Sequence, residues 1–263
     1  MTITVGDVAA AMDRIFPPAT AQAWDRVGLA VGDVHAPVRR IGFAVDPCEA
    51  SVEEAIERGA DMLITHHPLY LRGTHAVTSR TAKGRWTAAL IRSDTALFSA
   101  HTNADVAAST LALAALLGVE LERPLDEASG LGGVGRLSRP TSLRAFADLV
   151  ARSLPPVPAG VLVGGDLARQ VRRVAICSGS GDSFLAEANA AGADVYLTAD
   201  LRHHPVTDHL WDGGCALVCA THWASEWPVL ALMDERLRSE LGDRAPEAYV
   251  SRIPTDPWTL AVR

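Results

Sequence analysis

The sequence predicts an α/β protein with two similar lobes, built on mostly parallel or mixed sheets that are flanked by helices. Three observations predict this fold: an internal repeat, short apolar runs that alternate with segments of helical composition, and glycines where the helices should end. The 263 residues are enough for two lobes of ordinary size. A chain of this length also buries enough surface to fold without a disulfide or a structural metal.

The repeat is visible as three pairs of matching segments. They are VRRIGFAVD (38–46) with VRRVAICSG (171–179), GAD (59–61) with GAD (192–194), and ALFSAHTNAD (96–105) with ALVCATHWASE (216–226). The first two pairs share an offset of 133 residues, and each member of the third pair joins an apolar run to a histidine that is followed four residues later by a carboxylate. We infer two homologous lobes, because chance rarely produces a constant offset over several segments.

The elements follow in the same order in both halves. Strands are predicted at 41–45, 61–65, 96–100, 174–178, 194–198 and 216–220, and helices at 50–58, 86–91 and 183–191. Gly59 and Gly192 stand where these helices should end. The glycine-rich stretch 127–135 is predicted to connect a first lobe, 1–126, to a second lobe, 136–263, with no inserted domain.

Charge and composition exclude several classes of function. Lys and Arg number 24 against 31 Asp and Glu, a net charge of −7, so no overall field attracts nucleic acid or an anionic membrane. The longest apolar run, 111–119, is too short to cross a bilayer, and the N-terminus has acids where a signal peptide needs a basic start. The four cysteines form no C-x-x-C pair and are expected to be reduced and packed. We expect a cytoplasmic protein.

Histidines stand at the ends of three predicted strands. His66 and His67 follow strand 61–65, and His101 and His222 follow the two later runs of the repeat. Because the carboxyl ends of strands in an open α/β sheet face the ligand crevice, these side chains should gather there. Several histidines with acids nearby predict metal ligation rather than ordinary structural roles.

The spacing of these residues predicts which side chains point in the same direction. His222 and Glu226 are four residues apart where a helix is predicted to start, so their side chains share one face. The same holds for His101 and Asp105 if the stretch after Asn103 is helical. The adjacent His66 and His67 point apart on an extended chain, so either they serve two ions or the chain turns sharply at Pro68.

Ligand number indicates two ions rather than one. The candidate ligands are His66, His67, Asp105, His222 and Glu226. One catalytic ion with an open position needs about three protein ligands. Five ligands suffice for two ions if Asp105 and Glu226 bridge them. The mixed nitrogen and oxygen set suits Zn, Mn, Fe or Co and does not distinguish among them.

These residues resemble a known family, the GTP cyclohydrolase type 2 homologues, also called the NGG-one interacting factor three-like proteins. The matching stretches are Trp24 to Leu29 with Gly32, Gly59 to Pro68, His101 to Asp105, Gly179 to Gly181 with Gly192 to Asp194, Asp200 with His204, and His222 with Glu226. They cover most of the chain. The resemblance implies a dinuclear metal site in the cleft between the lobes, held by the same five ligands, and a toroidal homohexamer.

The sequence departs from the family pattern at three positions. Ala199 stands where the family has Gly, His203 where an aromatic residue is common, and Pro47 follows Asp46 where small residues are usual. None of these changes removes a proposed ligand, so they bear on the substrate. Three further candidates could support the ligands or contact substrate: His101, Asn103 and His204. His101 is also the candidate for proton transfer.

The function predicted is a dinuclear metal-dependent hydrolase in which metal-activated water attacks a nucleotide-like or phosphorylated small molecule. By resemblance this substrate is GTP, with formate lost from the purine. The alternative is a metal-binding or metal-delivery protein without turnover, and a third possibility is an interaction scaffold. The ligand types do not separate them.

Overall fold

The computed structural model describes residues 2–262, which form two compact units. Unit 1 comprises residues up to 104 and 230–255, and unit 2 comprises residues 105–229 and those from 256. This division differs from the predicted one at 127–135. The reason is strand pairing: the strand at Val119–Arg123 pairs with the strand at Gly133–Ser142, and residues 230–255 return to the first unit.

Unit 1 is built on a five-stranded sheet in the order β1-β4-β3-β2-β11. Its strands are β1 (Gly28–Val31), β2 (Arg40–Ala44), β3 (Met62–Thr65), β4 (Ala96–Ser99) and β11 (Glu247–Val250), and its helices are α1 (Val5–Ile15), α2 (Glu49–Glu57), α3 (Ala82–Arg92), α4 (Thr102–Ala104) and α10 (Val229–Leu241), with short 3₁₀ turns at Pro18–Thr20 and Gly242–Arg244. All neighbouring strands are parallel except β1, which runs antiparallel to β4. The sheet therefore presents the carboxyl ends of β2, β3 and β4 at one edge.

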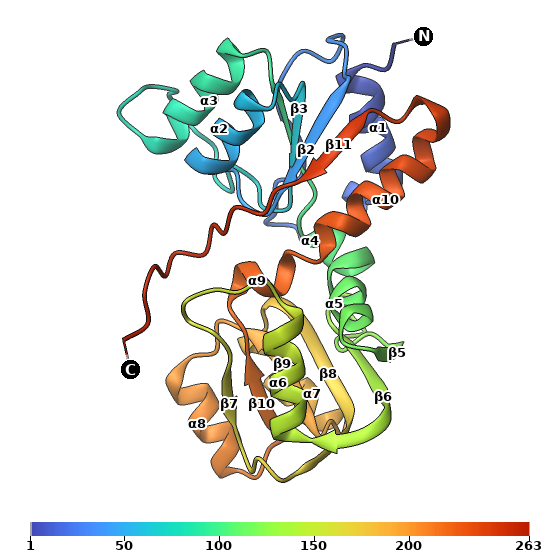
Figure 1. The fold of residues 1–263 in the computed structure, drawn as a ribbon, viewed down its shortest axis with the longest axis vertical. Helices are drawn as coiled ribbons and strands as arrows, with labels where there is room; N and C mark the ends of the chain where they lie inside the picture. The colour runs from blue at the N-terminus through green and yellow to red at the C-terminus, as the bar shows by residue number, and fades with distance from the viewer. Residues whose placement is uncertain (1, 263) are drawn as a thin grey trace. The chain divides into compact units, whose positions relative to one another are not determined.

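Helices cover both faces of this sheet. Figure 1 shows α2 and α3 on one side of β2 and β3, and α1 and α10 on the other. Val52, Ala55, Leu63, Leu90 and Leu97 form the core under α2 and α3, and all are almost fully buried. Strands buried on both faces consist of continuous apolar residues, which is why the runs in β2, β3 and β4 were visible in the sequence.

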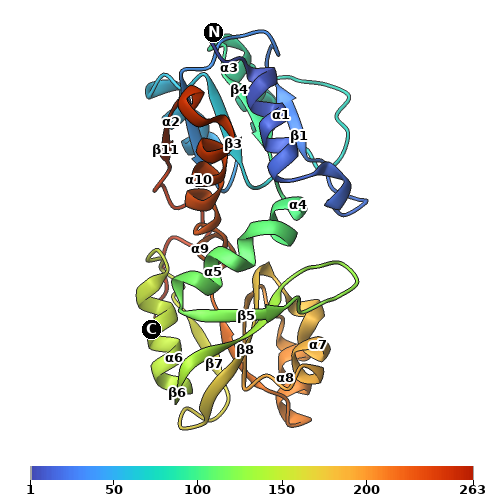
Figure 2. The same cartoon turned by 90° about the vertical axis from the view of Figure 1, so that its right-hand side faces the viewer.

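Unit 2 is built on a six-stranded mixed sheet in the order β5-β6-β8-β9-β10-β7. Its strands are β5 (Val119–Arg123), β6 (Gly133–Ser142), β7 (Leu162–Gly164), β8 (Gln170–Ser180), β9 (Val195–Ala199) and β10 (Ala216–Cys219), and its helices are α5 (Thr110–Leu116), α6 (Leu143–Ser153), α7 (Leu185–Ala190), α8 (His203–Trp211) and α9 (His222–Glu226), with a π-helical turn at Asp105–Ser109 and a 3₁₀ turn at Asp182–Phe184. Only β8, β9 and β10 are parallel neighbours. In Figure 2, α5 and α6 lie on one face of this sheet and α7 and α8 on the other.

The repeat is confirmed by equivalent hydrogen bonds in the two units. Oδ2 of Asp61 accepts from the backbone N–H groups of Arg39 and Arg40 at 2.6 and 2.9 Å. Asp194, 133 residues later, accepts from the N–H groups of Arg172 and Arg173 at 2.8 and 2.7 Å. The aspartate of each GAD segment therefore ties the start of one strand to the start of the next, which explains why VRR and GAD recur together.

Both helices that precede GAD end on a left-handed glycine. Gly59 has φ of 62° and Gly192 has φ of 65°, and a Cβ built at either position meets no atom within 4 Å. The requirement at these positions is backbone conformation alone. Among residues 2–262, none of the helices is long and apolar enough to cross a membrane.

Candidate metal centre

The histidines of unit 1 gather at the carboxyl ends of β3 and β4. His66 and His67 follow β3 directly, and His101 follows β4 after one residue. The ring centroids are 5.1 Å apart for His66 and His67, and His101 lies 5.2 Å from each. One nitrogen from each ring lies within 4.8 Å of the others, so the three imidazoles can hold a metal ion.

Each of these rings is oriented by an oxygen on its Nδ1 atom. The partners are the backbone carbonyl of Ala100 for His66, at 3.0 Å, and the carboxylate of Asp46 for His67, at 2.7 Å. An oxygen acceptor places the hydrogen on Nδ1 and leaves the lone pair on Nε2. This is the arrangement that metal-binding histidines usually have. His66 is fully buried, so its orientation is also fixed by packing.

His101 is held in the same way by Asp25. Nδ1 of His101 lies 2.9 Å from Oδ1 of Asp25, while Oδ2 accepts from the N–H and hydroxyl of Thr102 at 3.0 and 2.6 Å. Burial opposes ionisation of Asp25, but the hydrogen bonds from His101 and Thr102 outweigh it and lower the pKa of this carboxyl well below its usual range. Asp25 therefore remains charged and holds Nδ1 of His101 by a hydrogen bond.

In unit 2, the predicted pair on one helix face is present. His222 begins α9 and Glu226 ends it, and Nε2 of His222 lies 2.9 Å from Oε1 of Glu226. Two ligand atoms about 2.1 Å from one ion and about 90° apart lie about 3 Å from each other, so this separation suits a shared ion. Nδ1 of His222 contacts Oδ2 of Asp200 at 2.6 Å, which orients the ring so that Nε2 faces Glu226.

Asp105 joins this pair in unit 2. One of its carboxylate oxygens lies within 4.8 Å of a carboxylate oxygen of Glu226. Asp105 opens the π-helical turn before α5, and single π turns occur often at functional sites. Burial, with the charges of Asp105 and then Glu226, raises the pKa of the Cys177 thiol to about 12. The thiol of Cys177 is therefore packed and protonated.

The backbone at the end of β8 makes room for this group. Gly179 has φ of 66°, and a Cβ built on it would lie 2.2 Å from Oε1 of Glu226 and 3.2 Å from Nε2 of His222. The N–H of Gly179 donates to Oγ of Ser225, which itself donates to the carbonyl of His222. A side chain at position 179 would displace these two ligand atoms, and Ser225 fixes α9 to the strand end. The set of nitrogen and oxygen ligand atoms fits a divalent ion.

Strand register corrects one predicted equivalence. Ala96 of β4 pairs with the first residue of β3, and Ala216 of β10 pairs with the first residue of β9, so Ala96 and Ala216 are equivalent. His101 therefore corresponds to Thr221, and not to His222. Thr221 caps α9 and His101 precedes α4 in the same position. The two histidine–carboxylate pairs are displaced by one residue, so they are not copies of each other.

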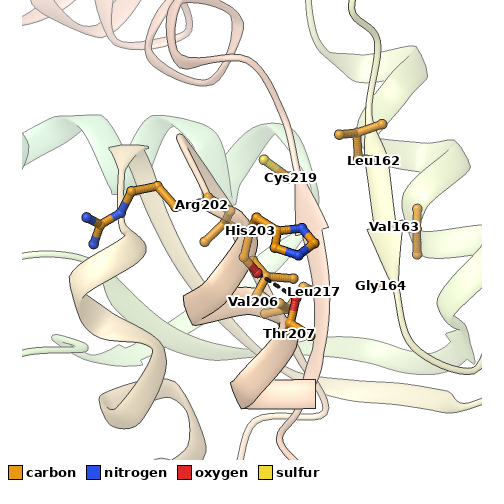
Figure 3. Close-up of a pocket in the computed structure, with 10 residues that line it drawn as sticks. Leu162, Val163, Gly164, Arg202, His203, Val206, Thr207, Leu217 and Cys219 are labelled. Atoms are coloured by element: carbon orange, nitrogen blue, oxygen red, sulfur yellow. Dashed lines mark hydrogen bonds between the residues drawn. The ribbon is translucent and has the colours of Figure 1, made fainter. Parts of the chain in front are cut away.

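The remaining candidates have other surroundings. Asn103 is buried, its Oδ1 accepts from the N–H of His101 at 2.9 Å, and its Nδ2 donates to the carbonyl of Phe16 at 2.7 Å. It therefore positions the backbone of His101. His204 is exposed in the first turn of α8, beside the ring of His203 at 5.1 Å. In Figure 3, His203 lines a mainly apolar pocket of about 200 Å³ between β7 and α8.

Three carboxylates that orient histidines were missing from the predicted site: Asp25, Asp46 and Asp200. Asp46 and Asp200 follow β2 and β9 closely, at the same strand ends as the histidines, and this position could have identified them. Asp200 adopts the left-handed region with φ of 56°, which few non-glycine residues do. The strained backbone holds its carboxylate against His222. Thr255 donates a hydrogen bond to Asp46 and fixes the anchor of His67.

Comparison with known proteins gives consistent matches along the chain. Residues 3–257 match the family described as Duf34/NIF3 (NGG1p interacting factor 3). A Streptomyces coelicolor protein named GTP cyclohydrolase 1 type 2 homolog is 44% identical over 98% of this chain and 94% of its own length. A solved Bacillus cereus protein related to NIF3 covers 99% of this chain and 100% of its own at a TM-score of 0.88, and its 22% identity supports the fold alone. A Staphylococcus aureus structure gives a TM-score of 0.87 at 25% identity, over 98% of this chain and 99% of its own.

Proposed function

Because the chain belongs to the Duf34/NIF3 family, we propose that it is a metal-dependent hydrolase-type protein that acts on a nucleotide-like or phosphorylated small molecule. The proposal assigns two divalent ions to His66, His67, Asp105, His222 and Glu226 acting together. The observation that carries it is the shared orientation of the histidines. In both units, an oxygen holds Nδ1 of the histidine, which leaves Nε2 as the nitrogen available to a metal ion.

When bound, such ions supply a nucleophile at neutral pH by lowering the pKa of water. The protein contributes orientation and charge. Asp46 and Asp200 hold the rings of His67 and His222 in one orientation, and Ser225 fixes the helix that carries Glu226. The carboxylates of Asp46 and Asp200 at the strand ends make their surroundings negative, which favours a divalent cation over an anion.

His101 is proposed to move a proton during the reaction. Its Nδ1 remains on the ionised Asp25, so Nε2 can accept a proton and release it to a leaving group. Asp25 orients the ring of His101 in the way that the aspartate of a catalytic triad orients its histidine. His101 lies beside His66 and His67, where a reacting group would be held.

The test is turnover by metal-loaded protein. GTP, with formate release as the readout, is assayed beside a panel of phosphoesters and amides. A hydrolase predicts saturable rates that EDTA removes and that His222→Ala abolishes while circular dichroism remains native. His35→Ala, an exposed histidine outside the site, is the matched control and should keep the wild-type rate.

Absence of saturable turnover, combined with readily exchangeable metal, would instead support the metal-delivery alternative. An interaction scaffold would keep its partners in His222→Ala. The homohexamer and the cytoplasmic location remain predictions from the sequence. Sedimentation of the purified protein tests the first, and fractionation of cells tests the second.

A further inference from the structure

The segment that follows the histidine pair of unit 1 is basic in an otherwise acidic chain. Between Met62 and Ser93 there are five Lys and Arg residues and no Asp or Glu, so the rest of the chain carries a net charge of −12. Residues 71–80 are all exposed, and they form most of the loop between β3 and α3. Surface loops of this length without secondary structure are usually functional. We call residues 71–85, which comprise this loop and the first turn of α3, the basic arm.

The cations of the basic arm have no carboxylate partners. Ion pairs are common elsewhere in the described chain, yet none within residues 2–262 involves Arg72, Arg80, Lys83 or Arg85. Arg85 donates only to the carbonyl of Ser79 at 3.3 Å, and Nζ of Lys83 lies 5.8 Å from the Tyr70 ring centroid. Four cations without counter-charges raise the local potential and favour binding of an anion.

Two of these cations converge on one pocket. Arg72 and Lys83 line a cavity of about 480 Å³ together with Tyr70, Thr74 and Thr81, and no carboxylate lines it. A second cavity of unit 1, by contrast, is lined by Asp33, Asp61 and Asp94. Arg72 lies five residues after His67, so their Cα atoms are at most about 18 Å apart. One extended anionic substrate can therefore contact both.

The arm is also held in place against α3. Gly84 is buried, and a Cβ built on it would lie 2.1 Å from the carbonyl oxygen of Thr78. The loop backbone at Thr78 therefore packs directly on α3 at Gly84, where a larger residue would clash. Tyr70, at the base of the arm, shares a hydrogen bond of 3.0 Å with Thr87 of α3. The cations are presented from a defined loop.

We propose that the basic arm binds phosphate groups, and that Arg72 and Lys83 hold the phosphate-bearing end of a small-molecule substrate in this pocket. This inference deepens the proposed function, because it assigns the anionic part of that substrate to named residues. The pocket suits the phosphate chain of a mononucleotide. The arm has no exposed Phe, Tyr or Trp side chain on which the bases of a nucleic-acid strand could stack.

The test measures binding of inorganic tripolyphosphate by calorimetry in the presence of EDTA. Without metal, the result is independent of the metal centre and of turnover, so failure here and failure of the proposed function can be told apart. Wild-type protein should bind saturably. Arg72→Gln with Lys83→Gln should bind at least about 10-fold more weakly, because both direct contacts to the phosphate oxygens are lost.

Two further variants locate the site. Arg139→Gln with Arg152→Gln removes the same charge from exposed positions of unit 2 and should leave binding unchanged. Gly84→Ala keeps every charge but displaces the arm, and it should weaken binding as well. The proposal is overturned by no saturable binding in wild type, by equal loss in the unit 2 control, or by wild-type affinity in either arm variant. Preferential binding of a single-stranded oligonucleotide over tripolyphosphate would overturn it in favour of nucleic acid.

Discussion

Replacing Gly179 with alanine should weaken metal binding far more than it weakens the fold. The built Cβ lies 2.2 Å from Oε1 of Glu226, whereas ordinary contacts begin near 3.4 Å, so this oxygen must move by about 1 Å. Metal–ligand distances tolerate only about 0.2 Å. A displaced ligand should therefore cost metal affinity about 10- to 100-fold or more, by analogy with the loss of groups that orient ligands.

The cost to stability should be smaller and is separately measurable. The nearest atom is the end of a side chain that can rotate, so the main penalty is the left-handed backbone, about 1–2 kcal/mol for a residue with a Cβ. Gly192→Ala is the matched control, because Gly192 has φ of 65° and nothing within 4 Å of a built Cβ. Both variants should lose similar thermal stability.

The assay combines thermal unfolding with competition for Zn²⁺ against a chelator of known affinity. Gly192→Ala should retain wild-type metal affinity while Gly179→Ala loses it. Equal metal affinity in the two variants, with equal loss of stability, would refute the reasoning that Gly179 exists to admit the donor atoms of Glu226 and His222.

Three further predictions follow from the same structure. Asp200→Gly should relieve the left-handed backbone and raise stability by up to about 1 kcal/mol. It should also reduce metal affinity about 10-fold or more, because His222 loses the carboxylate that orients it. A variant in which thermal stability and metal affinity, measured by chelator competition, both rise or both fall would contradict this. Asp61→Ala and Asp194→Ala each remove two hydrogen bonds to backbone N–H groups and should each cost about 1–3 kcal/mol in urea unfolding; a cost in only one of them would contradict the structural repeat. Burial raises the pKa of Tyr249 to about 12 and raises that of Tyr196 further. The stability gained by burying these two neutral phenols is therefore complete below about pH 10, and it is lost as the pH approaches 12. Ultraviolet absorbance should therefore show Tyr196 and Tyr249 ionising only as circular dichroism reports unfolding. Ionisation of either of these two residues near pH 10 in native protein would contradict the prediction.

Much of the fold was predictable because the repeat is carried by local chemistry. An apolar run buried on both faces of a parallel sheet is visible without any structure, as in β3 and β9. The left-handed glycines and the aspartates of GAD perform the same task in both units. The antiparallel strands at the edges, such as β1 and β7, were not predicted because they are short and half-exposed.

The ligand candidates were predictable for a related reason. Strand ends at one edge of a sheet bring side chains together, and the i, i+4 spacing of His222 and Glu226 gave a helix face that the structure confirms. The carboxylates that orient the histidines were harder to predict, because a contact such as that of Asp25 with His101 joins residues 76 positions apart. The one-residue displacement between His101 and His222 depends on strand register, which no local pattern encodes.

Metal content per chain tests the central claim most directly. Protein purified without added metal, and then equilibrated with Zn²⁺ or Mn²⁺ and freed of excess, is analysed for bound metal beside His66→Ala and His222→Ala variants of native circular dichroism. The claim predicts two equivalents per wild-type chain and a clear loss in both variants. Wild-type protein without bound metal, or variants that retain the full content, would contradict it.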